Sequence, residues 1–177
     1  PEGYRLVVWA DGGWSGAQLT LPEGTYTNDG QIELRTAYNY GPGQPRLAVG
    51  ADTVLAGDGE VWMSHAGSWY QDEPWITGPE GAALSVGAGQ RIHGFGQIRM
   101  PVLNAGLIEA DWSGKTLTLT AAVTNTGTLR AGSGATLAVN GALLNEGAVV
   151  VADGGALSAA AGLVNNGTIV WGNTASV

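Results

Sequence analysis

The sequence contains no cysteine, only seven lysine and arginine residues and a single phenylalanine among 177 residues. Without cysteine the chain can form neither a disulfide framework nor a thiolate zinc site. The formal net charge of −8 leaves no basic stripe to neutralise phosphates, which argues against nucleic acid and anionic membranes as partners. No apolar run approaches the roughly 18 residues that a membrane span needs, so we expect no membrane insertion of this segment.

Glycine is abundant instead, at 30 of 177 residues, without proline-rich or serine-rich low complexity. This composition indicates many backbone turns rather than disorder. The opening PEGYRLVVWADGG lacks the basic and apolar order of a signal peptide, and the final GNTASV stops partway through a repeat unit. The start indicates a mature protein or an excised piece, and the end favours a piece of a longer protein.

Asn-x-Gly triplets recur in the second half of the chain with a period of about 20 residues. They begin at Asn104, Asn125, Asn145 and Asn165. A second series of alternating segments, at 117–119, 137–139 and 157–159, has the same period. Such a period with strand-like alternation and without helical spacing is typical of a parallel β-helix. The sequence thus predicts an all-β solenoid in which each unit carries two short strands.

Residue parity predicts the role of the repeated asparagines. Val123, Asn125, Gly127 and Leu129 share one face of their unit, and the next units repeat the set. If the apolar members point inward, each Asn lies at a bend above the last one, at the strand spacing of about 4.8 Å. There its amide can donate to and accept from its neighbours in a ladder, and the adjacent Gly permits a positive φ or a close approach. We assign these asparagines a structural role and no chemistry.

The first half repeats less regularly. Residues 46–63 align without gaps on residues 83–100 at an offset of 37, which a coil and an inserted excursion at 64–80 would explain. Residues 17–34 have the same strand, turn and strand form, so we expect the β-helix to begin by about residue 17. We expect one β-helical domain over 1–177, with a first coil or cap at 1–16, irregular coils at 17–103 and regular coils at 104–177.

Residues that could carry chemistry are concentrated before the regular coils, where 11 of the 15 acidic residues lie within 1–103. The alignment at an offset of 37 stacks Asp58 on Phe95 and Glu60 on Gln97, so neither gains a carboxylate partner. His93 is expected to face solvent beside a turn glycine. Two isolated histidines without a spaced acidic cluster predict no metal site, and no motif indicates a cofactor.

Aromatic side chains interrupt the repeat pattern in and beside the excursion at 64–80. The candidate binding residues there are Trp62, His65, Trp69, Tyr70, Asp72, Glu73 and Trp75. Trp and Tyr beside amide and carboxylate groups offer flat apolar faces with polar rims, which stack on sugar rings or anchor a protein partner. The alternative is that the excursion folds its aromatic rings over the coil as a local core.

The repeat units at 103–110, 124–139 and 164–169 follow the pattern LxNxGxIxAxxGxTLxV. This pattern resembles the repetitive passenger regions of large bacterial exported adhesins of the filamentous haemagglutinin and autotransporter types. The resemblance implies a right-handed parallel β-helix that is secreted or displayed on the bacterial surface. It is not specific for an activity, because similar coils occur in polysaccharide-acting and scaffolding proteins.

Together these features predict a non-enzymatic stalk and adhesive surface of a bacterial surface or secreted protein. The expected partner is a glycan or host-surface ligand at the 64–80 excursion. One alternative is a polysaccharide hydrolase or lyase that uses acidic residues of the same region. Another is a scaffold module that self-associates end to end through its exposed strand edges.

Overall fold

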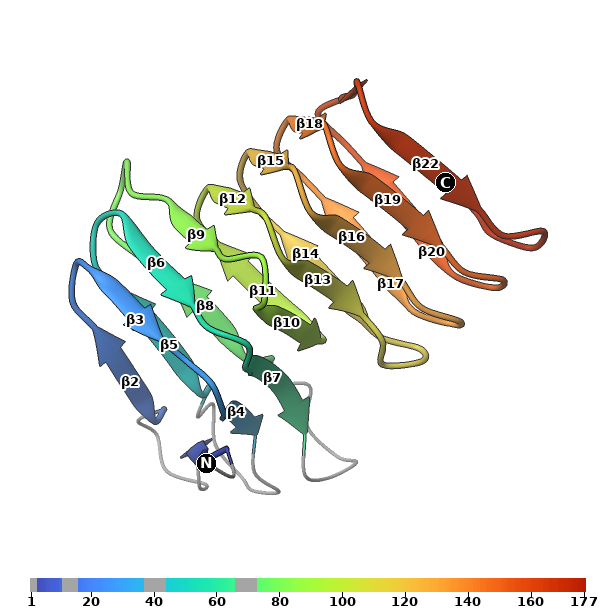
Figure 1. Ribbon diagram of the computed structural model, residues 1–177. Coiled ribbons are helices and arrows are strands. Elements are labelled where there is room, and N and C mark those ends of the chain that lie inside the picture. The colour runs from blue at the N-terminus through green and yellow to red at the C-terminus, as the bar shows by residue number, and fades with distance from the viewer. Residues whose placement is uncertain (1–2, 11–15, 37–43, 66–72) are drawn as a thin grey trace.

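The computed structural model describes residues 3–10, 16–36, 44–65 and 73–177, which form strands and turns and no helix. Within these ranges, twenty-two strands assemble into three sheets, here named A, B and C, in which every pairing is parallel. The chain passes from A to B to C and back to A, so each strand pairs with the strand three places further along. Figure 1 shows the successive coils side by side, from the blue N-terminal end to the red C-terminal end.

Among the described strands, sheet A contains eight and sheets B and C contain seven each. Sheet A consists of β1 (Arg5–Ala10), β4 (Gln31–Thr36), β7 (Glu60–His65), β10 (Arg91–Gly94), β13 (Leu107–Ala110), β16 (Thr128–Ala131), β19 (Ala148–Val151) and β22 (Thr168–Trp171). Sheet B consists of β2 (Gln18–Leu21), β5 (Arg46–Val49), β8 (Trp75–Thr77), β11 (Gly96–Arg99), β14 (Thr116–Leu119), β17 (Thr136–Val139) and β20 (Ala156–Ala159). Sheet C consists of β3 (Thr25–Thr27), β6 (Thr53–Ala56), β9 (Leu84–Val86), β12 (Val102–Asn104), β15 (Val123–Asn125), β18 (Leu143–Asn145) and β21 (Leu163–Asn165).

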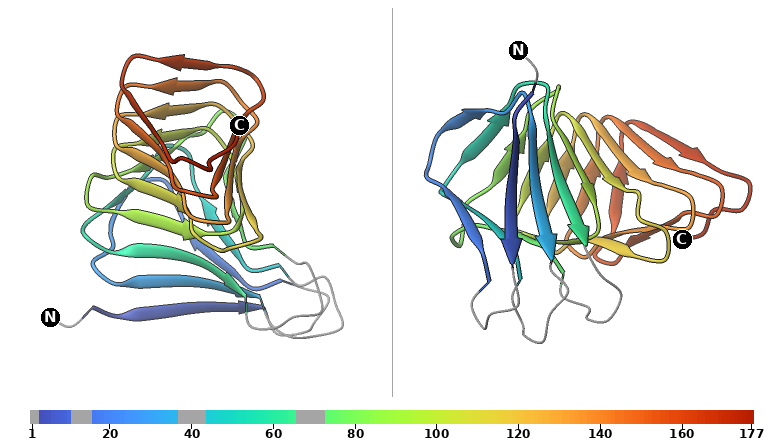
Figure 2. Two further views of the ribbon diagram at one scale, coloured as in Figure 1. Left: turned by 90° about the vertical axis from the view of Figure 1, so that its right-hand side faces the viewer. Right: turned by 90° about the horizontal axis from the view of Figure 1, so that it is seen from below.

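This architecture is a right-handed parallel β-helix, which confirms the predicted fold class (Figure 2). Each complete coil has three strands rather than the two expected per unit. The third strand is the short segment that ends at the repeated Asn, for example β15 at Asn125, and the bend follows at residues 126 and 127. The parity pattern treated residues 123–129 as one alternating segment, so it predicted β15 and β16 as a single strand.

Columns of apolar side chains fill the space between the sheets. Ile92, Ile108, Leu129 and Val149 occupy paired positions on β10, β13, β16 and β19, and all four are fully buried. Burying a side chain of this size contributes about 1.5–3 kcal/mol, and each column repeats the gain in every coil. The outward residues between these columns therefore lie in rows at the strand spacing, and these rows carry the polar chemistry.

The register of the first half differs from the alignment at an offset of 37. β7 pairs with β10 so that Glu60 lies beside Arg91, and β6 pairs with β9 so that Thr53 lies beside Leu84. Both pairings correspond to an offset of 31, and Leu47, which the alignment matched to Leu84, lies in a different sheet. Short apolar strands of equal parity look alike in sequence, so similarity alone did not identify the sheet.

β1 pairs with β4 from Arg5 onward, so the segment expected to be a first coil or cap contributes a strand to sheet A. The excursion at 64–80 is shorter than its predicted bounds. Ser64 and His65 end β7, and Trp75–Thr77 form β8. After β1, β4 and β7, more residues separate the strand of sheet A from the next strand of sheet B than in the regular coils, so these coils are longer.

Candidate functional site

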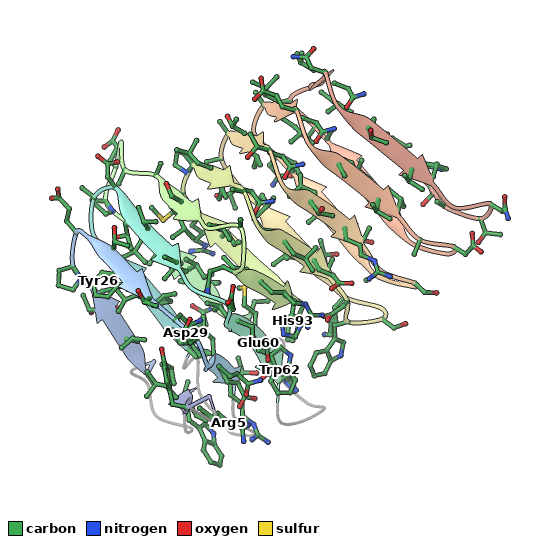
Figure 3. The ribbon with its side chains drawn as sticks, in the orientation of Figure 1. Arg5, Tyr26, Asp29, Glu60, Trp62 and His93 are labelled. Carbon is green, nitrogen blue, oxygen red and sulfur yellow. The ribbon has the colours of Figure 1, made fainter. Side chains whose placement is uncertain are left out.

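Charged and aromatic side chains gather on the outer face of sheet A in the N-terminal coils. Ile32 and Leu34 of β4 point into the core, so the residues between and beside them point outward. Seven of these outward side chains come from β4, β7, β10 and β13 and from the residue directly after β13. We call them the polar face: Glu33, Glu60, Trp62, Arg91, His93, Glu109 and Asp111. Figure 3 shows Glu60, Trp62 and His93 projecting from neighbouring strands toward the same side.

His93 lies at the centre of the polar face and is 7% exposed. Its Nδ1 is 2.8 Å from Oδ2 of Asp111, and its Nε2 is 3.2 Å from Oε2 of Glu60. The Glu60 contact is at ion-pair distance only, because Nε2 has no aligned hydrogen-bond partner among the described residues. The imidazole also stacks on Trp62, with 6.0 Å between ring centroids and 4° between planes. The prediction that His93 faces solvent is therefore wrong, because its neighbours on both adjacent strands cover it.

Arg91 links the acids on either side of His93. Its Nη2 donates to Glu109 at 2.8 Å and to Asp111 at 2.9 Å, and its Nη1 is 3.4 Å from Glu60. Arg130 approaches the other oxygen of Glu109 at 3.0 Å. The three carboxylates around Arg91 therefore share three cationic partners when His93 is protonated.

Glu33 forms a second polar group on the same sheet, one coil earlier. Its carboxylate pairs with Arg5 and accepts a 2.7 Å hydrogen bond from the hydroxyl of Ser64. Glu33 and Ser64 are each 1% exposed although both point outward. A carboxylate buried to this degree requires a cation and a hydrogen bond to remain charged, and Glu33 has both.

The charges of the polar face shift the pKa of Asp111. Burial raises the pKa of this carboxyl, but the hydrogen bond from His93 and the charges of His93 and Arg91 outweigh it, so the pKa lies below its ordinary value of 3.8. The side chain is therefore an anion at neutral pH. It is suited to orienting His93 and accepting hydrogen bonds, and unsuited to donating a proton.

A shallow open groove of about 550 Å³ lies at the edge of the polar face, where sheet C turns into sheet A. Its charged and aromatic lining consists of Tyr4, Arg5, Asp29, Asp58, Glu60 and Arg91, which come from four successive coils. Asp29 and Asp58 are exposed, and the backbone N–H of Asp58 donates to Oδ1 of Asp29 at 3.1 Å. Arg5, Asp29 and Glu60 are labelled in Figure 3. The groove runs across the strands, along the axis of the helix.

The residues predicted to form one binding site lie on different faces. Trp62 belongs to the polar face, whereas Trp75 lies on the outer face of sheet B beneath two arginines. His65 packs at the corner between the sheets, where its ring is 6.2 Å from that of Phe95. Glu73 accepts a 2.9 Å hydrogen bond from Gln97. Trp69, Tyr70 and Asp72 lie outside the described residues.

The repeated asparagines form a continuous ladder. Nδ2 of Asn104 donates to Oδ1 of Asn125 at 2.7 Å, Asn125 donates to Asn145 at 2.7 Å, and Asn145 donates to Asn165 at 2.6 Å. Each of the first three also donates to a backbone carbonyl of the following coil. The ladder joins the coils inside the corner, where Asn104, Asn125 and Asn145 are buried and Asn165 ends the column at the exposed last coil.

Sequence reasoning missed the polar face, because the offset of 37 separated Glu60 from Arg91 and His93. It also missed that Asn28 occupies the ladder position in the first coil, three residues before β4 as Asn125 is before β16. The signal was present, since Asn28-Asp29-Gly30 is itself an Asn-x-Gly triplet and residues 57–59 read Gly-Asp-Gly. Aligning these two triplets would have given the correct register between β4 and β7.

A scan against protein-family models, a search of curated proteins and a search of solved structures each return no match to this chain. Within the described ranges, no group of three or more His, Asp or Glu side chains is arranged to hold a metal ion. The same ranges contain no helix of the length and apolarity that crosses a membrane.

Proposed function

We propose that the chain is a rigid, non-catalytic β-helical segment of a bacterial surface or secreted protein that binds an uncharged saccharide along the groove of its N-terminal coils. The observation that carries this proposal is the groove itself, which crosses four coils along the helix axis and stays open to solvent. An open, elongated groove fits a stretch of polymer better than a small enclosed substrate. The cellular location rests on the resemblance of the regular coils to exported adhesins.

The groove offers the groups that saccharide hydroxyls use. Asp29 and Asp58 present exposed carboxylates, and Tyr4 contributes an aromatic ring beside them. Arg5 is already paired with Glu33. Arg91 is already paired with three acids of the polar face: Glu60, Glu109 and Asp111. The free charge of the groove is therefore negative, which favours a neutral polyol over an acidic one.

A binding role agrees with the pairing of the acids on the polar face. Glu33, Glu60, Glu109 and Asp111 each contact an arginine, and two of them also contact His93. Hydrolysis of glycosides usually needs one carboxyl group that keeps its proton, in an environment that raises its pKa. The environment of Asp111 lowers its pKa instead. We propose that these ion pairs brace the wide coils and hold the groove in shape.

The test is a glycan array with the paired substitution Asp29→Asn and Asp58→Asn. We expect binding of the neutral saccharide that the wild type selects to weaken about tenfold or more, because charge-assisted hydrogen bonds are lost. The matched control is Asp153→Asn, which removes an aspartate that also accepts from a backbone N–H, at 2.6 Å from Asn173, in a distant coil. Unchanged binding in the double variant, or an equal loss in the control, would refute the groove as the binding site.

A polysaccharide hydrolase or lyase is the second candidate, favoured by the position of His93 between Glu60 and Asp111 with Arg91 beside them. In this function saccharide binding would have to uncover His93, which would then exchange a proton with the saccharide while Arg91 faces a substrate carboxylate. Release of reducing ends or unsaturated products by the wild type, abolished by His93→Gln, would replace the non-catalytic proposal. No turnover of neutral or acidic polysaccharides would exclude this candidate.

A further inference from the structure

Two arginines cover one tryptophan on the outer face of sheet B, away from the groove. The guanidinium carbon of Arg99 lies 3.3 Å from the centroid of the Trp75 ring, and that of Arg46 lies 4.7 Å from it. The three residues belong to β5, β8 and β11, which are successive strands of the sheet. Cation–π contacts of this kind fix the direction of both guanidinium groups. The stack also explains why Trp75 does not offer an open ring face to a sugar.

The arginine pair carries positive charge that the described part of the chain does not neutralise. Neither Arg46 nor Arg99 lies within ion-pair distance of a described carboxylate, although the net charge of the chain is −8. Glu73, the nearby acid, accepts a hydrogen bond from Gln97 instead. The pKa of Arg99 is lowered by partial desolvation against the sheet and by the charge of Arg46, and Glu73 opposes this only in part. The two guanidinium groups therefore repel each other in the free protein.

The polar atoms at this stack that lack a partner among the described residues are all donors. Nε of Arg46 and Nε1 of Trp75 are buried N–H groups for which this part of the chain supplies no hydrogen-bond acceptor. Nε of Arg99 is satisfied, since it donates to Gln97 at 2.8 Å. An unpartnered buried donor is costly, and its complement is an acceptor oxygen. Arg46 is only partly buried, so its side chain is within reach of a ligand at the surface of the sheet.

We infer that this face of sheet B binds the carboxylate of an acidic saccharide through Arg46 and Arg99. The planar guanidinium group matches a carboxylate with two parallel hydrogen bonds, and an anion relieves the repulsion between the two arginines. Apart from Glu73, which Gln97 holds by a hydrogen bond, the neighbouring outward side chains are neutral hydrogen-bonding groups suited to sugar hydroxyls: Gln18, Thr20, Thr77, Gln97 and Thr118. The net charge of −8 would repel a densely charged polyanion such as nucleic acid. A ligand with widely spaced negative charges therefore fits better.

The experiment is calorimetric titration with three probes: a trimer of galacturonate, its methyl ester and inorganic sulfate. We expect the wild type to bind the trimer, to bind the ester about tenfold more weakly or worse, and to lose affinity as salt is added. Arg46→Gln and Arg99→Gln should each weaken trimer binding about tenfold, and Arg99→Lys should retain part of it because the charge remains. Arg35→Gln is the matched control, since Arg35 also stacks on a tryptophan, at 5.4 Å from Trp9 on sheet A.

The inference is overturned if the ester binds as well as the acid, or if both glutamine variants fold normally and bind as the wild type does. Sulfate binding as tight as the trimer would identify a free-anion site and overturn the saccharide assignment. Arg99 is exposed, so its variants should keep the unfolding midpoint of the wild type. The groove variant with Asp29→Asn and Asp58→Asn should bind the trimer normally, which separates this site from the proposed neutral-saccharide groove.

Discussion

Asn28 and Gln90 hydrogen-bond to each other across the coil that lies between them. Nδ2 of Asn28 donates to Oε1 of Gln90 at 3.0 Å, and Nε2 of Gln90 donates to the backbone carbonyl of Asn28 at 2.6 Å. The intervening coil has Gly57 at the ladder position, three residues before β7, and a glycine has no side chain to continue the ladder. The longer Gln90 side chain spans this gap from the following coil.

Replacing Gln90 by leucine should destabilise the protein by about 1–3 kcal/mol. The buried Asn28 then loses an acceptor for its side-chain amide and a donor to its backbone carbonyl, while the volume at position 90 is roughly kept. Urea unfolding, followed by circular dichroism, measures the change. Gln18→Leu is the control, since Gln18 is exposed and bonds only to Thr20 among the described side chains. An equal effect of the two substitutions would contradict a structural role for the Gln90 bridge.

The regular coils were predictable because each position repeats itself. Leu137 pairs with Leu117 and Leu157, and Asn125 pairs with Asn104 and Asn145. Residues that are one repeat period apart in the sequence are therefore the residues that pair between neighbouring strands. No long-range information was needed. Both the fold class and the hydrogen-bonded asparagine column follow from this identity of period and register.

The first half was less predictable because its coils differ in length. Once the period varies, register depends on which strands share a sheet, and the alternation of Leu47 and Leu84 is the same in sheet B as in sheet C. The ladder there is carried by Asn28 and Gln90, which differ in residue type and in position relative to the strand. The triplet pattern is therefore broken where it would have been most informative.

The polar face was missed for the same reason. Glu60, His93 and Asp111 come from three successive coils, and they meet only if β7, β10 and β13 are paired in the observed register. A shift of six residues, the difference between the two offsets of 37 and 31, places Glu60 beside Gln97 instead. The sequence shows that acids and aromatic residues are frequent before residue 104, and the register decides which of them touch.

The position of an asparagine within the ladder should set its contribution to stability. Asn125 is fully buried and exchanges hydrogen bonds with the asparagine on either side, whereas Asn165 ends the ladder and is exposed. Asn125→Leu should cost about 1–3 kcal/mol by removing one hydrogen-bond partner from each of two buried amides, and Asn165→Leu less than about 1 kcal/mol. Thermal unfolding of both variants measures the difference. Equal losses at both positions would mean that the ladder does not stabilise the coils.

The glycine after each ladder asparagine is required by close approach rather than by a positive φ. A Cβ on Gly127 would lie 2.3 Å from the carbonyl oxygen of Gly106 and 2.5 Å from backbone atoms of Ala105. Gly127→Ala should therefore destabilise the protein by about 3 kcal/mol, because backbone on the adjacent coil must move.

Gly114 offers the contrasting case for this prediction. Its φ is 74°, and a Cβ at this position would meet no atom of the described residues within 4 Å. Gly114→Ala should cost only about 1–2 kcal/mol, the strain of the left-handed conformation. Urea unfolding of both alanine variants compares the two causes. A larger loss at Gly114 than at Gly127 would show that coil spacing adapts easily to an added methyl group.

The polar face should make stability depend on pH through Asp111. The folded-state pKa of this carboxyl lies below 3.8, because the hydrogen bond and charge of His93 and the charge of Arg91 outweigh the effect of burial. Its stabilising contribution is therefore fully present above pH 3.8 and is lost as the pH falls through the lower folded-state pKa. The titration is measured from the ¹³C shift of the Asp111 carboxyl.

Removing either cause should move that titration upward. In His93→Gln and in Arg91→Gln the pKa of Asp111 should rise toward or above its ordinary value, because burial is then opposed by fewer favourable contacts. Lys115→Gln serves as the control, since Lys115 lies over the Phe95 ring and not among the groups that act on Asp111. In the wild-type background, Asp111→Asn should lower the free energy of unfolding by an amount that shrinks below pH 3.8. In the His93→Gln background, the effect of the same substitution should vary less with pH. A difference that is constant across this range would show that ionised Asp111 does not stabilise the folded state through its contact with His93.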